Sequence, residues 1–252
     1  MTIPEITEDG FLGGRIVVRQ PRRGFRAGLD AVMLAAAVPA RDGDACLELG
    51  SGAGVASLCL AARVPGCRVL GMEIDAALVA LANESAAGNG FAGRVRFIEG
   101  DAIGTEPDGA PFDHVFLNPP FHPAGANVSP DAARDAAMRD KDNAVPRWLA
   151  RALALGKPGG TVTAILRADR IGDAARATGQ AVRILWLLPR AGAEPKRAIL
   201  QTGGQTGGQT GGGEGRFVLH EADGRYTQEA EAVLRHGGAL RLTPQFGDGY
   251  TR

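Results

Sequence analysis

The 252-residue sequence lacks several features that would assign it to a membrane or to a secreted protein. No apolar run approaches the ~18 residues that a membrane-spanning helix needs. The N-terminal stretch MTIPEITEDG has no basic segment followed by an apolar one, so a signal peptide is not expected. The three cysteines, Cys46, Cys59 and Cys67, are odd in number and lie among apolar residues. They indicate reduced core residues in a cytoplasmic protein rather than disulfides.

Excess charge and metal-ligand spacing are also missing. Lys plus Arg equals Asp plus Glu at 28 each, so any nucleic-acid surface has to be local. The four histidines show no ligand spacing, and no metal site is predicted. At 44% hydrophobic and 22% charged residues, the composition is that of a globular protein with a substantial core.

The middle of the chain alternates short apolar runs with helical patterns. This alternation predicts βαβ units, a parallel sheet and right-handed crossovers. We expect helices at residues 55–63, 76–89 and 146–155, a turn at residues 157–160, and strands at residues 45–49, 68–73, 95–99, 112–117 and 161–166. Ligands of such sheets bind beyond the carboxyl ends of the strands, where Glu73, Asp101 and Asn118 stand.

Two flanking segments differ from this core. The first is predicted to contain a strand at residues 15–19, a turn at Gln20-Pro21 and a helix capped by Asp30. The second, QTGGQTGGQTGGGEG at residues 201–215, is a low-complexity repeat that predicts a flexible loop. The runs at residues 196–200 and 216–220 flank the repeat and could pair as an antiparallel hairpin with the repeat at its tip.

A glycine-rich loop follows the first core strand in "CLELGSGAGVASLCLA". Glycines between a strand and a helix let the backbone approach a ligand. A dinucleotide fingerprint would need a third glycine where Val55 stands. The pattern E-x-G-x-G-x-G instead resembles the cofactor loop of class I S-adenosylmethionine methyltransferases.

That resemblance implies a Rossmann-like fold: a mostly parallel seven-stranded sheet with helices on both faces and a short N-terminal β-α extension. It implies a single domain over residues 1–252, with residues 1–40 over the active site and residues 41–200 as the cofactor and catalytic core. S-adenosyl-L-methionine is the implied cofactor, with Glu73 on the ribose hydroxyls and Asp101 on the adenine amino group. The other cofactor-binding residues carried over are Glu48, Gly50, Gly52, Gly54 and Asn118.

The stretch "FLNPPFHP" closes the strand at residues 112–117, because proline cannot donate to a sheet ladder. Its Asn118-Pro119-Pro120-Phe121 resembles the motif of methyltransferases that modify an amino group conjugated to a ring or carbonyl. The Asn118 amide oxygen and the Pro119 carbonyl would accept the two N–H groups and orient the nitrogen. Phe121 would stack on a flipped base. The plainer alternative is a proline turn with Phe121 in the core.

The substrate is indicated by "DGFLGGRIVVRQPRRGFRAGLDAVMLAAAVPA", which runs into the glycine loop. It resembles the N-terminal signature of bacterial tRNA (adenine-N6)-methyltransferases, whose studied member acts next to the anticodon of a valine tRNA. The resemblance covers residues 9–200 and implies an RNA substrate, with tRNA adenine N6 as the target. "NPPFH" also resembles rRNA guanine-N2 methyltransferases, and a protein glutamine methyltransferase is a further alternative, because its target is also a conjugated nitrogen.

Arginines gather within this segment. Phosphate contacts are predicted for Arg15, Arg19, Arg22 and Arg23, with Phe25 among them. The alternative is a solvated basic turn. Arg26 and Asp30 are assigned to the cofactor side, because this segment is expected to fold over the methyl-donor site.

Overall fold

A computed structural model of the chain describes residues 5–24, 26–120, 144–204 and 212–242. Phe25, Phe121 and His122 therefore lie outside the described residues. The elements are, in chain order, β1 (Ile6–Phe11), β2 (Ile16–Pro21), α1 (Leu29–Ala37), β3 (Ala45–Leu49), α2 (Val55–Arg63), β4 (Arg68–Glu73), α3 (Ala76–Gly88), β5 (Val95–Glu99), β6 (Phe112–Leu117), α5 (Ala144–Leu155), β7 (Gly156–Arg167), η1 (Ala168–Arg170), α6 (Ile171–Thr178), β8 (Val182–Arg190), β9 (Arg197–Gly203), β10 (Gly213–His220) and α7 (Gln228–Leu234).

The main sheet has the strand order β10-β8-β9-β7-β6-β3-β4-β5. Only β9 runs antiparallel to its neighbours, β7 and β8. The described residues thus form eight strands where seven were expected, because β10 adds in parallel to the outer side of β8. The sheet also extends past residue 200, which was the expected end of the core.

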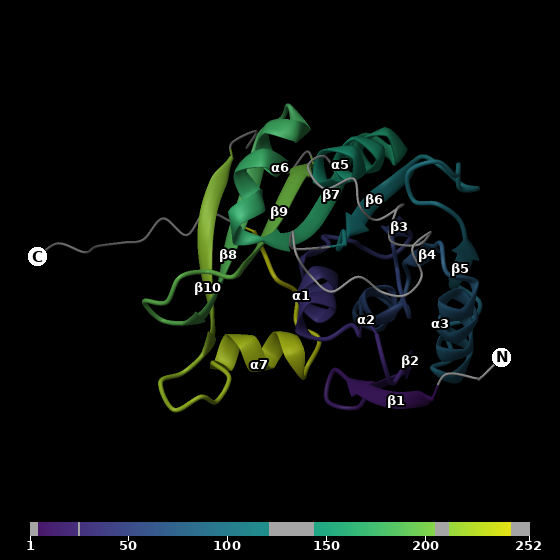
Figure 1. Cartoon of the computed structure of the whole chain (residues 1–252), viewed down its shortest axis with the longest axis horizontal. Coiled ribbons are helices and arrows are strands. Elements are labelled where there is room, and N and C mark those ends of the chain that lie inside the picture. The colour runs from purple at the N-terminus through teal and green to yellow at the C-terminus, as the bar shows by residue number, and fades with distance from the viewer. Residues whose placement is uncertain (1–4, 25, 121–143, 205–211, 243–252) are drawn as a thin grey trace, which may run out of the picture.

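Helices cover both faces of the sheet, as the parallel pattern predicts. α1, α2, α3 and α7 contribute to one buried apolar cluster, and α5 and α6 to another. Figure 1 shows α5 and α6 above the sheet and α1, α2, α3 and α7 below it. No helix within the described ranges is both long enough and apolar enough to cross a membrane.

The N-terminal strands β1 and β2 form a separate antiparallel hairpin beside α3. The β2 backbone donates to α3 and its C-cap: Arg19 N bonds to Ser85 Oγ and Val17 N to Asn89 Oδ1, both at 3.0 Å. The side chain of Gln20, 2% exposed, accepts from Ala27 N at 2.9 Å and so closes the loop between them. The body of the extension therefore packs on α3, and its end leads into α1.

Three local expectations were wrong. α1 begins after Gly28, so Asp30 lies in the first turn instead of capping the helix. Residues 157–160 lie within β7, where a shift in register places them opposite Asp113. The hairpin expected from residues 196–200 and 216–220 does not form, because β8 lies between β9 and β10 and pairs with both.

The repeat at residues 201–215 is also not loop throughout. Residues 201–203 complete β9 and residues 213–215 begin β10; residues 205–211 lie outside the described part. Gln201 is 4% exposed, and its Nε2 donates to Ala37 O and to Thr163 Oγ1, both at 3.0 Å. The first residues of the repeat thus join the central sheet to α1.

This contact gives a stability prediction. Gln201→Ala should lower the free energy of unfolding by about 1–3 kcal/mol, because two buried acceptors lose their donor. Thermal unfolding should show a Tm lower by several degrees. Gln228→Ala, at an exposed position at the start of α7, is the matched control and should leave the Tm within about a degree. A wild-type Tm for Gln201→Ala would mean that the repeat contributes nothing to the fold from its first residue onward.

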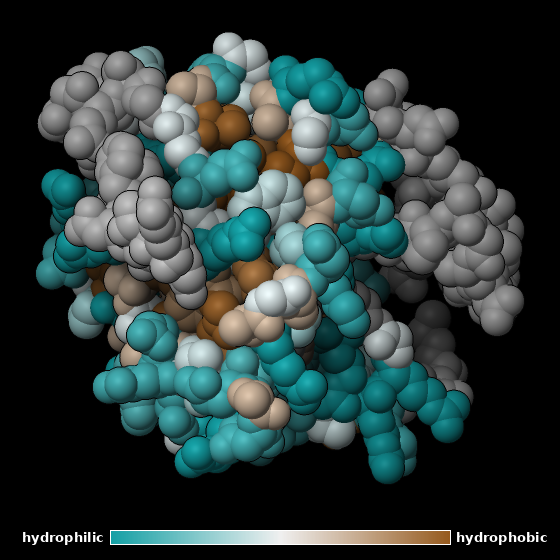
Figure 2. All heavy atoms as spheres, turned by 90° about the vertical axis from the view of Figure 1, so that its left-hand side faces the viewer, coloured by the Kyte–Doolittle hydropathy of each residue, from teal (hydrophilic) through white to brown (hydrophobic). Residues whose placement is uncertain are grey.

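At its outer edge the sheet ends in β10. The charged side chains of Glu214 and Arg216 are exposed there, and Trp186 Nε1 of β8 donates to Glu214 Oε2 at 2.9 Å. Seen from this side, hydrophobic side chains reach the surface in patches separated by hydrophilic ones (Figure 2). Charges on an edge strand discourage further strand pairing.

Candidate active site

The carboxyl ends of four adjacent strands meet at one edge of the sheet. Their order is β6-β3-β4-β5, so Asn118, Gly50, Glu73 and Asp101 follow one another at spacings of about 4.8 Å between strands. Gly50 N and Ser51 N both donate to Met72 O of β4, at 2.9 and 3.0 Å. The structure therefore brings together the residues that the strand ends predicted.

The three glycines of the loop differ in what a side chain at each position would contact. All have positive φ, at +69°, +54° and +84° for Gly50, Gly52 and Gly54. A Cβ on Gly50 would lie 2.8 Å from the Trp148 ring, and one on Gly54 would lie 2.5 Å from the Phe97 ring. A Cβ on Gly52 would meet no atom within 4 Å. Packing thus explains two of the glycines, and only Gly52 faces open space that a ligand could fill.

Glu73 is half-buried at the end of β4 and is held by the backbone. Its Oε2 accepts from Gly52 N at 2.9 Å and its Oε1 from Asp75 N at 3.0 Å. Each carboxylate oxygen has a second lone pair, so both remain able to accept a hydroxyl. Glu73 is therefore fixed in direction and still suited to a ribose diol.

Glu48 lies beneath the loop, 4% exposed. Its Oε2 accepts from Ser57 N at 3.0 Å and from Ser57 Oγ at 2.5 Å, in the first turn of α2. Gly54, the N-cap of α2, has no side chain for this task, so Glu48 of β3 caps the helix instead. Its described contact is with α2, and its contact with the cofactor stays a prediction.

Burial raises the pKa of Glu48 to about 8, with the nearby Glu73 charge adding to it and the bonds from Ser57 opposing it. The folded protein therefore holds more protons here than the unfolded chain between the ordinary pKa, 4.5, and about 8. Stability from this group is full below the lower value and is lost as the pH rises through the upper one.

We expect the unfolding free energy of the wild type to fall with pH across this window, by about 2 kcal/mol between pH 5 and pH 7 from Glu48 alone. Glu48→Gln removes the titrating group and keeps a neutral acceptor for Ser57. Chemical denaturation at pH 5, 7 and 8.5 should therefore show a flatter pH dependence for the variant than for the wild type. Parallel curves would mean that Glu48 is ionised in the folded protein.

Asn118 and Pro119 follow β6 directly, and Pro119 is buried while Pro120 is exposed. Among the described residues, Asn118 Oδ1 is buried and has no hydrogen-bond partner. A buried acceptor without a partner is costly and is expected to serve a ligand. Asn118 thus presents the kind of acceptor that the motif predicted.

Sequence reasoning missed two residues here. Ser51 Oγ, inside the glycine loop, is a second buried atom without a partner in the described part of the chain. Its position between two glycines could have marked it. Trp148 of α5 packs against Gly50, and nothing in the sequence pattern links these two positions.

Asp101 is exposed and stabilises its own turn. Its Oδ1 accepts from Ile103 N at 3.0 Å, and its backbone N–H donates to Thr105 Oγ1 at 3.0 Å. It lies one strand beyond Glu73, so its role toward the adenine amino group stays a prediction.

Most N-terminal arginines are paired with acidic side chains. Arg19 contacts Glu8 and Glu84 at 3.2 and 2.7 Å, and Arg22 contacts Glu5 at 3.0 Å. Arg15 donates to the carbonyl of His236 at 3.0 Å. Arg23 is exposed and forms no ion pair within the described residues. The segment is therefore less cationic than its sequence suggests.

Arg26 and Asp30 also have partners within the protein. Arg26 Nη2 contacts Asp9 Oδ2 at 2.5 Å. Partial burial raises the pKa of Asp9, but hydrogen bonds from Arg26, Gln20 and Thr7 outweigh it and lower the pKa overall. Asp30 Oδ2 accepts from Arg197 Nε at 2.9 Å and fixes the start of α1 to the start of β9. A role toward the cofactor stays a prediction for both.

The described part of the chain holds no group of three or more His, Cys, Asp or Glu side chains arranged for a metal ion. The carboxyl ends of the strands do hold a glycine loop with open space at Gly52 and the oriented carboxylate of Glu73. They also hold two buried oxygens, Asn118 Oδ1 and Ser51 Oγ, that have no partner among the described residues. This fold and site define a class I methyltransferase, with S-adenosyl-L-methionine as cofactor.

Comparison with known proteins narrows the class. Residues 27–141 match the methyltransferase small domain. The chain is 32% identical over 223 residues to the tRNA1(Val) (adenine(37)-N6)-methyltransferase of Aeromonas hydrophila, which covers 86% of this chain and 92% of the relative. A release factor glutamine methyltransferase of Chlorobaculum tepidum is 33% identical over 94 residues, 36% of this chain and 32% of that protein.

A solved structure, a predicted O-methyltransferase from Agrobacterium tumefaciens, shares the fold with a TM-score of 0.67 at 21% identity, over 84% of this chain and 98% of that one. The chain belongs to the family of bacterial tRNA1(Val) (adenine(37)-N6)-methyltransferases.

Proposed function

We propose that the protein methylates the exocyclic N6 amino group of adenine in a tRNA, and that position 37 of a valine tRNA is the first substrate to test. The observation that carries the proposal is the Oδ1 of Asn118 at the end of β6, one strand away from the glycine loop, which is buried and has no partner within the described ranges. Family membership supplies the nucleic-acid class. A cytoplasmic location belongs to the same proposal.

The chemistry needs little more than positioning. An amino group on adenine is a weak nucleophile, because its lone pair is delocalised into the ring. Asn118 Oδ1 accepts one N–H and the Pro119 carbonyl accepts the other, which draws the nitrogen toward tetrahedral geometry and localises its lone pair for attack on the methyl group. When bound, the cofactor supplies a methyl group on a sulfonium sulfur in line with that lone pair.

The charges and burial of the site residues are consistent with this mechanism. Transfer of the methyl group leaves a cationic amine, which loses its extra proton to water, so no strong general base is needed at the site. Glu73, held by its bond from Gly52 N, is proposed to bind the cofactor ribose, and the raised pKa of Glu48 favours a neutral carboxyl beneath it over a second negative charge. Phe121, outside the described residues, is proposed to stack on the target base.

A protein glutamine amide is the main alternative, because the same two acceptors would orient it. The relative with that activity matches over 94 residues, whereas the tRNA-modifying relative matches over 223 residues. Guanine N2 in rRNA is the second alternative, on the same chemistry.

One experiment separates the three. The protein is incubated with labelled S-adenosylmethionine and, in parallel, with undermodified total tRNA, ribosomal RNA and a peptide carrying a release-factor glutamine. Nucleosides and amino acids are then identified by mass spectrometry. We expect N6-methyladenosine in the tRNA sample alone. N2-methylguanosine or methylglutamine as the main product would overturn the proposal.

A further inference from the structure

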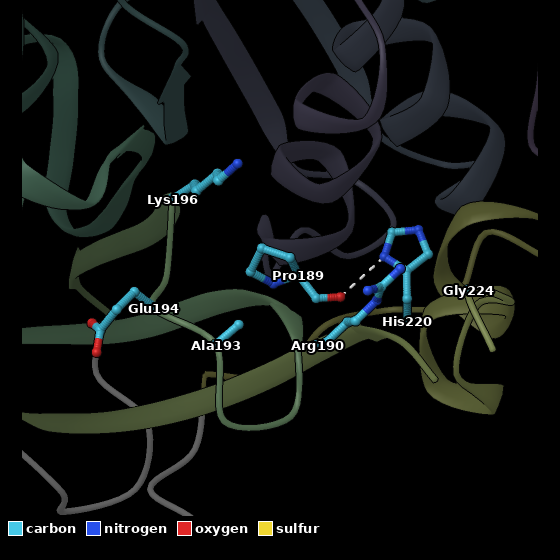
Figure 3. A pocket seen from close by; sticks show the side chains of 7 residues that line it. All are labelled: Pro189, Arg190, Ala193, Glu194, Lys196, His220 and Gly224. Carbon is cyan, nitrogen blue, oxygen red and sulfur yellow. Dashed lines mark hydrogen bonds between the residues drawn. The ribbon is translucent and has the colours of Figure 1, made fainter. Parts of the chain in front are cut away.

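We propose that a pocket at the carboxyl ends of β8 and β10 is a second contact site for the tRNA and binds its backbone phosphates; this inference rests on the proposed function. The pocket has a volume of about 610 Å³. It lies between the β8–β9 loop and the end of β10 (Figure 3), and its lining includes Pro189, Arg190, Glu194, Lys196, His220 and Gly224.

The pocket opens at the same edge of the sheet as the candidate active site. β8 and β10 run parallel to β7 and β6, and the antiparallel β9 starts at this edge, directly after Lys196. In the order β6-β7-β9-β8-β10, the pocket lies two to four strands from Asn118. At about 4.8 Å per strand, that is roughly 10–20 Å, a distance that a short single strand of RNA spans.

Two cations at this pocket differ from Arg19 and Arg22 of the N-terminal segment. The side chains of Arg190 and Lys196 are exposed, and neither forms an ion pair with any residue that the structure describes. Arg19 and Arg22, by contrast, are held by Glu8, Glu84 and Glu5. A cation without a carboxylate partner gives up no ion pair when it contacts a phosphate, so Arg190 and Lys196 are better suited to that contact than Arg19 and Arg22.

The imidazole of His220 adds a fixed polar group. Its Nδ1 lies 3.1 Å from Pro189 O and must be the donor, because a carbonyl only accepts. The ring also stacks on Tyr226, with centroids 4.8 Å apart. These two contacts hold the ring still and leave Nε2 as the nitrogen available to a ribose hydroxyl.

Glu194 is the one acidic side chain in the lining. In Figure 3 its carboxylate points away from the ammonium of Lys196, and no ion pair joins the two. It would repel a phosphate and reduce the affinity of the pocket. Removing the charge of Glu194 should therefore tighten tRNA binding, whereas removing the charges of Arg190 and Lys196 should weaken it.

The test compares the tRNA binding of charge variants by filter retention, across a salt series and without turnover. Arg190→Gln/Lys196→Gln should weaken tRNA binding roughly tenfold near 150 mM salt and flatten the log–log salt slope by about 1.5. Glu194→Gln should tighten it. Cofactor affinity, measured by calorimetry, should not change in either.

The control is Arg68→Gln/Arg96→Gln, which removes the same charge. These two arginines are exposed on β4 and β5, the last two strands on the side of the sheet away from β10. The control should bind tRNA like the wild type. Wild-type affinity and slope for Arg190→Gln/Lys196→Gln, or an equal loss in the control, would overturn the inference. If the wild type methylates tRNA in these cases, the proposed function survives; if the wild type neither binds nor methylates tRNA, both fall.

Discussion

Asn118→Ala is expected to lower kcat by roughly a hundredfold or more and to leave the affinity for S-adenosylmethionine unchanged. The reason is that the amide oxygen acts on the target amino group and not on the methyl donor. Because Oδ1 is buried without a partner among the described residues, its removal breaks none of the hydrogen bonds found within that part of the chain. Single-turnover kinetics on tRNA, calorimetry with the cofactor and thermal unfolding together check this expectation.

Asn83→Ala is the matched contrast. Asn83 Nδ2 donates to Val79 O and Phe97 O at 3.1 and 2.9 Å, and its Oδ1 accepts from Phe97 N at 3.0 Å. Its loss should lower the Tm and leave the kcat of the folded fraction near that of the wild type. If Asn118→Ala behaved like Asn83→Ala, the Asn-Pro-Pro segment would be a structural turn.

Glu73→Ala should weaken S-adenosylmethionine binding by about 30- to 1000-fold, since two charge-assisted hydrogen bonds are worth roughly 2–4 kcal/mol. The variant also removes the acceptor for Gly52 N, so the loop loses a hydrogen bond at Gly52, the glycine that faces open space. Isothermal titration calorimetry measures the change directly. Glu73→Gln keeps an acceptor without the charge and should fall between the wild type and Glu73→Ala.

Glu99→Ala is the control for this series. Glu99 is exposed at the end of β5, in register with Glu73 on β4. Its substitution removes one negative charge from the neighbouring strand end without touching the loop. Cofactor affinity should therefore stay within about twofold of the wild type, and unchanged affinity in Glu73→Ala itself would remove the ribose assignment.

The core strands and the glycine loop were predictable because their signals are local. Residues 45–49, 68–73, 95–99 and 112–117 form strands within the expected bounds, since buried parallel strands are short, largely apolar runs bounded by polar or turn-forming residues. The positions of Gly50, Glu73 and Asn118 at one edge then follow from parallel topology alone.

The C-terminal part of the sheet was not predictable in the same way. The runs that became β9 and β10 were recognised, but their pairing was wrong, since neighbouring strands in sequence often form hairpins. Here β8 bonds to β9 on one side and to β10 on the other. That arrangement depends on side chains distant in sequence, such as Trp186 and Glu214, and no local pattern contains it.

The sequence by itself thus determined the class of fold, the order of the core elements and the chemistry of the strand ends, because backbone restrictions and apolar periodicity act over a few residues. Only the tertiary structure decided which charges are neutralised, as with Arg19 against Glu84, 65 residues apart. It also decided that Asn118 Oδ1 is buried without a partner among the described residues. It likewise decided that Glu48 is buried deeply enough for its pKa to rise. Ion pairing, desolvation and exposure depend on contacts across the fold, so the arrangement of elements had to be known before they could be assigned.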